Sequence, residues 1–237
     1  MPNWTYNKIT CKKSIGDKIL TKDKDAILFD FNKLIPMPDS LNLTSGSIED
    51  RAVASYYLSL DKKDRRSLED ILDRKQVFFD GSYWNRYKTL VKYYEDNPDK
   101  FKEDNDSFDG KISECDKKFF NLSSLGKQYI ENIKDYGCSQ WYDWCSKNWG
   151  TKWNVMDEVS VDYDEIEEEY SIVFNTAWCP PYGIIEEYSK LCNPDEFNWE
   201  YENEDYDGHH HLTKDSSGKI IDTVIEDYEN EDEEMEI

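Results

Sequence analysis

Two hydrophobic periods divide this chain, and the change between them limits the folds that it can adopt. From about residue 47 to 149, apolar residues recur three or four positions apart, which is typical of helices. After Gly150 they fall on alternate positions, as Val159, Val161 and Tyr163 do, which is typical of strands. We therefore predict an α+β fold, in which an antiparallel sheet is packed with helices and the helical region is an insertion.

Residues that start or stop helices divide the helical region further. Ser47 and Asp50 have the spacing of a capping box, and a polar loop is expected over residues 100–118. Five helices are predicted. The first runs from Ser47 to about Leu60, the second covers about 63–75, and the third runs from near Ser82 to the residue before Pro98. The fourth ends at Gly137, and the fifth is short and contains Trp141, Trp144 and Cys145.

The strands are predicted from alternation and from turn residues on both sides of the helical region. A helix is expected over 182–191, between the hairpin that ends at 178 and the alternating run that begins at 197. The predicted extended segments are 3–11 and 26–35, a hairpin over 155–178 that turns near 164–168, the alternating run 197–204, and a last hairpin of 209–213 with 219–225.

Charge is distributed unevenly along the chain. Residues 1–150 hold 25 Lys and Arg against 25 Asp and Glu, whereas residues 151–237 hold 4 against 27, a net charge of −23. Like charges gathered in one region repel each other, so we expect this region to serve a separate purpose. Because contact with phosphates needs Lys and Arg, the acidity argues against direct binding of nucleic acid.

The acidic residues of this region fall largely on the predicted outward faces of strands or at strand ends. A sheet would hold them in a stiff array, and we predict that this array binds a basic partner. The last residues, 226–237, are too charged to pack and are expected to be a disordered tail. The predicted partner-binding residues are Glu158, Asp162, Asp164, Glu200, Glu202, Glu204, Asp205 and Asp207.

Other features bear on location and redox state. No run approaches the ~18 apolar residues that cross a bilayer, and the first residues lack a basic region followed by an apolar one, so a cytoplasmic protein without membrane contact is expected. Six cysteines occur without a Cys-x-x-Cys pair, and we expect reduced, mostly buried thiols. They are Cys11, Cys115, Cys138, Cys145, Cys179 and Cys192.

Two patterns suggest metals, and neither is complete. Residues 105–116 have the spacing of a calcium loop, but Asn105 and Ser107 replace acids and Asp116 replaces the bidentate Glu. Residues 209–211 are three histidines on one predicted strand, which could form half of a transition-metal site. We find no nucleophile elbow and no phosphate-binding glycine loop, so neither an enzyme nor a cofactor is expected. A cation-dependent enzyme or sensor remains an alternative.

Four blocks of sequence occur together in order. They are the opening Met-Pro-Asn-Trp, Phe29 to Pro38, Trp149 to Asn154, and Phe174 to Pro181. Together they resemble the YubB-like ferredoxin-like domain family, found on plasmids and phages. The resemblance implies a ferredoxin-like sheet packed with helices, which we expect over residues 1–225. The helical insertion at about 47–149 and the acidic tail depart from the family pattern and are expected to be specific to this protein. It implies no catalytic residues.

The motif residues of these blocks are interpreted as structural. Large rings that flank turns are expected to shape the core, and glycine suits the passage from helix to strand. The residues concerned are Trp4, Trp149, Gly150, Trp153, Trp178, Pro180 and Pro181.

Charge and resemblance together lead to one functional hypothesis. The chain is expected to be a phage- or plasmid-encoded protein that binds and inhibits a basic, nucleic-acid-handling host protein, such as a CRISPR effector or a restriction nuclease, by mimicking nucleic acid. The alternative is a non-enzymatic accessory protein that self-associates through aromatic residues of its helices, among them Tyr56, Trp84 and Tyr87.

Overall fold

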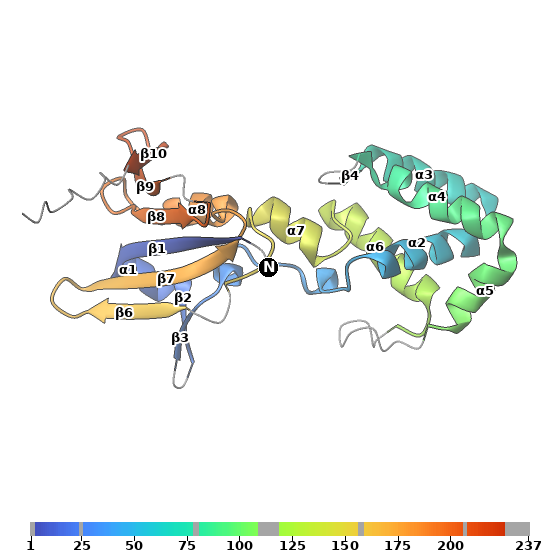
Figure 1. The fold of residues 1–237 in the computed structure, drawn as a ribbon, viewed down its shortest axis with the longest axis horizontal. Helices are drawn as coiled ribbons and strands as arrows, with labels where there is room; N and C mark the ends of the chain where they lie inside the picture. The colour runs from blue at the N-terminus through green and yellow to red at the C-terminus, as the bar shows by residue number, and fades with distance from the viewer. Residues whose placement is uncertain are drawn as a thin grey trace, which may run out of the picture. The chain divides into compact units, whose positions relative to one another are not determined.

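The computed structural model describes residues 3–23, 26–77, 81–108, 119–155, 159–205 and 208–225. The chain forms two compact units (Figure 1). The first contains residues 1–36 and 148–237, and the second contains residues 37–147. Strands of a large sheet lie in the first unit and six helices begin in the second, so the predicted α+β architecture is confirmed.

An antiparallel sheet of six strands is the centre of the first unit. Its spatial order is β10-β9-β8-β1-β7-β6, so the first strand of the chain lies between two strands from its last third. The strands are β1 (Trp4–Lys12), β6 (Ser160–Asp164), β7 (Glu169–Ala177), β8 (Trp199–Asn203), β9 (His209–Lys214) and β10 (Ile220–Ile225).

One face of this sheet is buried. In the three central strands every second residue is buried, and Phe174 and Trp199 meet edge to face with ring centroids 5.7 Å apart. Helices α1 (Lys13–Ile19) and α8 (Tyr182–Ser189) cover this face, and Tyr188 of α8 packs on Trp199. A small hairpin of β2 (Leu20–Asp23) and β3 (Ala26–Phe29) adds Phe29, followed by the 3-10 turn Phe31–Lys33.

A buried polar residue ties the central strands together. The Asn7 amide donates to the hydroxyl of Thr176 on β7 at 3.0 Å, and the Trp199 indole on β8 donates to Asn7 Oδ1 at 3.2 Å. Because buried polar groups are costly unless they are paired, this arrangement favours one register of β1 between its two neighbours.

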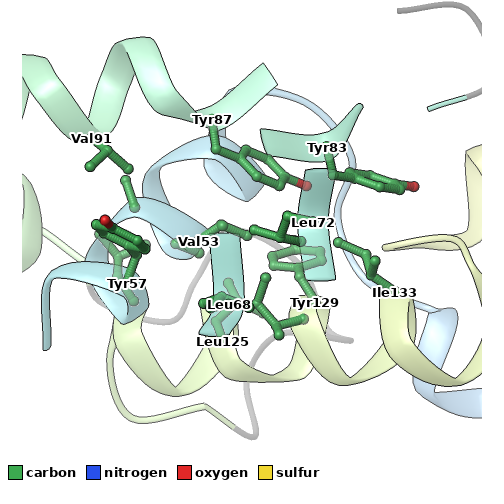
Figure 2. Close-up of a cluster of buried hydrophobic side chains, with 14 of the residues drawn as sticks. Val53, Tyr57, Leu68, Leu72, Tyr83, Tyr87, Val91, Leu125, Tyr129 and Ile133 are labelled. Atoms are coloured by element: carbon green, nitrogen blue, oxygen red, sulfur yellow. The ribbon is translucent and has the colours of Figure 1, made fainter. Parts of the chain in front are cut away.

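The second unit is built from helices around a core of aliphatic side chains and tyrosines (Figure 2). Helices α2 and α6 approach closely at Gly126, where an added Cβ would lie 1.9 Å from the Ala52 carbonyl oxygen. The described elements of the second unit are the 3-10 turn Asp39–Leu41, α2 (Ser47–Ser59), α3 (Lys62–Arg74), the pair β4 (Gln76–Val77) and β5 (Gly81–Ser82), α4 (Tyr83–Asp96), α5 (Pro98–Asp106), α6 (Leu122–Tyr136) and α7 (Trp141–Asn148).

Some sequence predictions for this unit need correction. Helix α2 does begin at Ser47, but its N-cap is Gly46 and no side chain caps it, so the predicted capping box is wrong. Asp50 instead accepts a hydrogen bond from Arg86 Nε at 2.8 Å. Part of the expected polar loop is helix α5, which starts at Pro98, since proline is well suited to the first helical position.

A buried carboxyl group lies inside this helical unit. Glu49 on α2 has 0% of its side chain exposed, and it accepts hydrogen bonds from Arg86 Nη2 at 2.9 Å and from the Tyr87 hydroxyl at 2.6 Å. Burial raises the pKa of Glu49 to about 7, although Arg86 and Tyr87 act in the opposite direction. The protonated form is therefore favoured by folding.

The close approach at Gly126 predicts that Gly126→Ala destabilises the protein. Overpacking costs about 1–3 kcal/mol, whereas alanine gains only about 1 kcal/mol in helix propensity. We expect a lower midpoint of urea unfolding, followed by far-ultraviolet circular dichroism. The control is Lys127→Ala on the exposed side of the same helix, which should change stability by less than about 0.5 kcal/mol. A higher midpoint for Gly126→Ala would contradict this packing.

The raised pKa of Glu49 predicts a pH-dependent stability difference. The contribution of Glu49 is fully present below pH 4.5, its ordinary pKa, and is lost as the pH rises through about 7. Glu49→Gln keeps an acceptor for Tyr87 but does not ionise. The free energy of unfolding of Glu49→Gln relative to wild type should therefore rise over this range, by up to about 1.4 kcal/mol for each pH unit. Urea unfolding at several pH values measures it, and a constant difference would refute it.

Candidate functional site

The second face of the six-stranded sheet is open. Apart from the buried Ala177 at the end of β7, the residues of β1, β7 and β8 that point to this side are partly or fully exposed, in contrast to the buried residues between them. No described element of the first unit covers this face, because α1 and α8 pack on the opposite one. We call it the open sheet face.

Four of the predicted acidic residues lie on the open sheet face. Asp162 and Asp164 pair with Ser171 and Glu169 of β7 at one edge, and Glu200 and Glu202 lie on β8. Three strand spacings separate β6 from β8, which corresponds to about 14 Å. The carboxylates therefore form two stripes, one on each side of β1 and β7.

Basic residues of β1 lie between these stripes. Lys8 Nζ is 3.8 Å from Glu200 Oε1, and Lys12 Nζ is 3.0 Å from Glu169 Oε1. The open sheet face therefore carries two ammonium groups among its carboxylates. Since exposed ion pairs contribute only about 0–1 kcal/mol, these lysines can exchange their partners easily.

A shallow hollow of about 500 Å³ lies over β1, β6 and β7 on the open sheet face. Its lining includes Lys8, Thr10, Asp162, Asp164 and Glu169. The Asp164 carboxylate accepts hydrogen bonds from the backbone N–H groups of Glu167 and Ile166, at 3.1 and 2.8 Å. These bonds lower the pKa of Asp164, so it is ionised at neutral pH.

The three histidines of β9 do not converge. His209 lies on the open sheet face, with Nδ1 2.5 Å from Glu202 Oε1 and Nε2 3.2 Å from Glu200 Oε2. His210 is nearly buried and bonds Asp222, while His211 contacts Asn198. Within the described ranges, no group of three or more His, Cys, Asp or Glu residues is placed to hold a metal ion.

The other predicted acidic residues lie at the end of β8 or outside the described ranges. Glu204 and Asp205 follow β8 and hold the start of the chain: the Trp4 backbone N–H donates to Glu204 at 2.6 Å, and the Asn3 amide donates to Asp205 at 3.2 Å. Glu158, Asp207, the tail 226–237 and most of the calcium-like segment 105–116 lie outside the residues that the structure describes.

The four sequence blocks meet at one end of the sheet. The Trp178 backbone N–H donates to the Asn3 carbonyl at 2.8 Å, and the Thr151 hydroxyl donates to the Ala177 carbonyl at 2.9 Å. Asn154 donates to Asp30 Oδ1 at 2.7 Å. Segments separated by more than 170 residues in sequence thus form one structure, which we call the motif cluster.

Part of the motif cluster is structural, as expected. Trp149 is buried, and its indole donates to the Ile35 carbonyl at 2.9 Å. Gly150 has φ +84°, and an added Cβ would lie 2.7 Å from the Tyr182 backbone nitrogen, so only glycine fits there. Pro180 and Pro181 directly precede helix α8, and Pro181 is its N-cap residue.

Trp178 departs from the expectation that it shapes the core. Its side chain is 51% exposed, and its backbone has φ +71°, a conformation that residues other than glycine rarely adopt. Trp153 and Trp4 are half-buried, and their ring centroids lie 6.5 Å apart. Nothing in the alternation of the sequence distinguishes this exposed tryptophan from the buried Trp149.

Comparison with protein-family models, with curated proteins and with solved structures gave no match to this chain. In the part of the chain that the structure describes, no helix combines the length and the apolar composition that a membrane crossing requires.

The contacts of His209 predict a measurable pKa. Its hydrogen bond to Glu202 raises the pKa of the imidazole above 6.5, with a further contribution from Glu200. Replacing Glu202 by Gln should lower this pKa, measured from the ring proton shifts in an NMR titration. Glu187→Gln on α8, which packs on the opposite face, is the control. An imidazole pKa that is unchanged in Glu202→Gln would show that this contact is absent in solution.

Proposed function

We propose that the first unit is a ferredoxin-like domain of a protein carried by a phage or plasmid. Its elements β1, α1, β6, β7, α8 and β8 follow the order strand, helix, strand, strand, helix, strand. Their order in the sheet, β8-β1-β7-β6, is that of a split βαβ arrangement, which supports the assignment. The mobile-element origin rests on the resemblance of the four sequence blocks to the YubB-like family.

The function that we propose is binding and inhibition of a basic, nucleic-acid-handling host protein. The observation that carries it is the pair of carboxylate stripes on the open sheet face, with Asp162 and Asp164 on one side and Glu200 and Glu202 on the other. The first unit holds 11 Lys and Arg against 31 Asp and Glu, whereas the second holds 18 against 21. The net charge is therefore −20 for the first unit and −3 for the second.

A sheet suits this purpose physically. Same-face residues on one strand repeat every ~6.8 Å, so Asp162 and Asp164 stand at a fixed spacing. A protein that binds nucleic acid presents Lys and Arg to a regular row of negative charges. Fixed carboxylates would attract such a surface, speed the encounter and make binding sensitive to salt.

The described cysteines favour a binding role over nucleophilic catalysis. Burial raises the pKa of Cys11 and of Cys145 to about 12, and the pKa values of Cys138, Cys179 and Cys192 are raised as well. A catalytic thiol needs a lowered pKa, because the thiolate is the nucleophile. These side chains therefore act as packing residues.

Self-association through aromatic residues of the helices is the less favoured hypothesis. Tyr87 is fully buried, and Trp84 packs on Tyr57 with ring centroids 5.1 Å apart. Tyr56 and Trp84 are partly buried against the same core, so the three rings leave little aromatic surface for an interface with a second copy. Light scattering on the purified protein would identify a homo-oligomer directly.

The proposed function predicts a salt-sensitive partner. Immobilised protein should capture a basic nucleic-acid-binding protein from bacterial lysate, and duplex DNA or raised salt should release it. The variant Asp162→Asn, Asp164→Asn, Glu202→Gln should bind that protein about tenfold more weakly, from about 0.5 kcal/mol for each lost charge. Isothermal titration calorimetry with the purified partner measures this loss.

A matched control separates position from net charge. The variant Asp70→Asn, Asp96→Asn, Asp135→Asn removes three exposed charges from the helical unit. It should keep the wild-type affinity within about threefold. Equal weakening by both triple variants would show that net charge alone, and not the open sheet face, is recognised. If duplex DNA does not release the captured partner, mimicry of nucleic acid is contradicted.

A further inference from the structure

Two tryptophans of the motif cluster hold a cation between them. The Lys152 ammonium lies 4.1 Å from the ring centroid of Trp153 and 5.0 Å from that of Trp178. Both distances fall within the ~6 Å over which an aromatic face attracts a cation. The rings of Trp153 and Trp178 are thus arranged as two walls of a cation site, and a side chain of the same protein occupies it.

The exposure of Trp178 has no explanation in the packing of the unit. Half of its surface is open, whereas the neighbouring Trp149 is buried and fixes the turn. The left-handed backbone conformation of Trp178, φ +71°, is also energetically unfavourable for a residue that has a Cβ. Strained, exposed aromatic residues are typical of ligand-binding positions rather than of cores.

Carboxylates lie at the same end of the sheet. Residue 178 follows β7, residues 3 and 4 begin β1, and residues 204 and 205 follow β8, so the three segments are neighbours across two strand spacings. Backbone hydrogen bonds join Trp178 to Asn3 and Glu204 to Trp4, at 2.8 and 3.0 Å. The two rings and the carboxylates of Glu204 and Asp205 therefore lie at the same end of the sheet, within a strongly acidic unit, and each carboxylate also accepts one hydrogen bond from the start of the chain.

We propose that Trp153 and Trp178, flanked by Glu204 and Asp205, form a binding site for an arginine side chain of a basic partner protein. Lys152 occupies this site in the free protein and leaves it when the arginine enters. The identity of the partner as a basic protein rests on the proposed function. The site itself rests on the geometry of the rings and the cation.

Arginine fits this site better than the alternatives. Its guanidinium is planar, stacks on aromatic faces, and pairs with carboxylates through two parallel hydrogen bonds. It is also less strongly hydrated than an ammonium group, so it can displace a lysine. Nucleobases stack on tryptophan too, but their phosphates would meet a unit with a net charge of −20.

Peptide binding tests the site directly. The full-length protein is titrated with a short peptide containing several arginines, and with the same peptide carrying neutral citrulline in their place. Tryptophan fluorescence and the indole N–H signals in NMR report binding. We expect the arginine peptide to bind and to shift the indole signals of Trp153 and Trp178. Equal affinity for both peptides would overturn the proposal.

Substitutions identify the residues that act. Trp178→Ala should weaken binding of the arginine peptide by between about twofold and thirtyfold, the range expected for a lost cation–π contact. Tyr93→Ala removes an equally exposed aromatic ring from helix α4 and should leave binding unchanged. An unchanged affinity in Trp178→Ala would overturn the proposal.

Removal of the resident cation gives the opposite change. Lys152→Met keeps a long, unbranched side chain but removes its charge. This variant should bind the peptide several times more tightly, because no cation competes for the rings. Lys190→Met, at the C-cap of α8, makes the same change in net charge and controls for charge alone. Equal tightening in both variants would show that Lys152 does not occupy the arginine site.

Folding is controlled separately. Glycine accepts the left-handed conformation at position 178, so Trp178→Gly should melt at a higher temperature than Trp178→Ala while binding equally weakly. Equally weak binding by two variants that differ in stability shows that the loss of binding does not follow stability. Restored binding in Trp178→Gly would overturn the role of the ring.

The two proposals can fail independently. If the triple variant of the open sheet face loses the captured partner but Trp178→Ala retains the arginine peptide, the proposed function stands and the arginine site is wrong. Conversely, arginine-dependent binding at Trp178 without capture of a basic partner would remove the proposed function and keep the site.

Discussion

The first unit depends on the insertion of β1 between β7 and β8. Backbone pairing runs along both sides of this strand, and the buried Asn7 side chain bonds Thr176 on one neighbour and Trp199 on the other. The same strand brings Lys8 and Lys12 between the carboxylate stripes and places Trp4 beside Trp153. Core, charge pattern and motif cluster therefore all follow from the position of one nine-residue strand.

Local rules predicted most of the regular structure. Gly137 ends α6 in the left-handed conformation and Ser82 caps α4, as the sequence indicates, and the hairpin of β6 and β7 turns where it was expected. Helix α1 was missed because its seven residues are too few to show a helical period. The placement of β1 was beyond these rules, since strand order depends on contacts between residues far apart in sequence.

The candidate site shows the same division. Alternation correctly places Asp162, Asp164, Glu200 and Glu202 on one face, because strand geometry decides it residue by residue. Their neutralising neighbours Lys8 and Lys12 come from the other end of the chain, so a count over residues 151–237 could not include them. Trp178 was misjudged because exposure of a ring depends on what packs around it, which no local pattern contains.

The indole of Trp149 bonds the Ile35 carbonyl, which brings together the two ends of the chain that enter and leave the helical unit. An insertion whose ends are already adjacent costs its host little, because the loop that it forms is closed by the host fold. Residues 37–147 are synthesised before β7 and β8, the two strands that pair with β1. The helical unit can therefore fold on the ribosome before β1 has a partner strand. A chain built this way exposes the edges of its first strand until its last third is made.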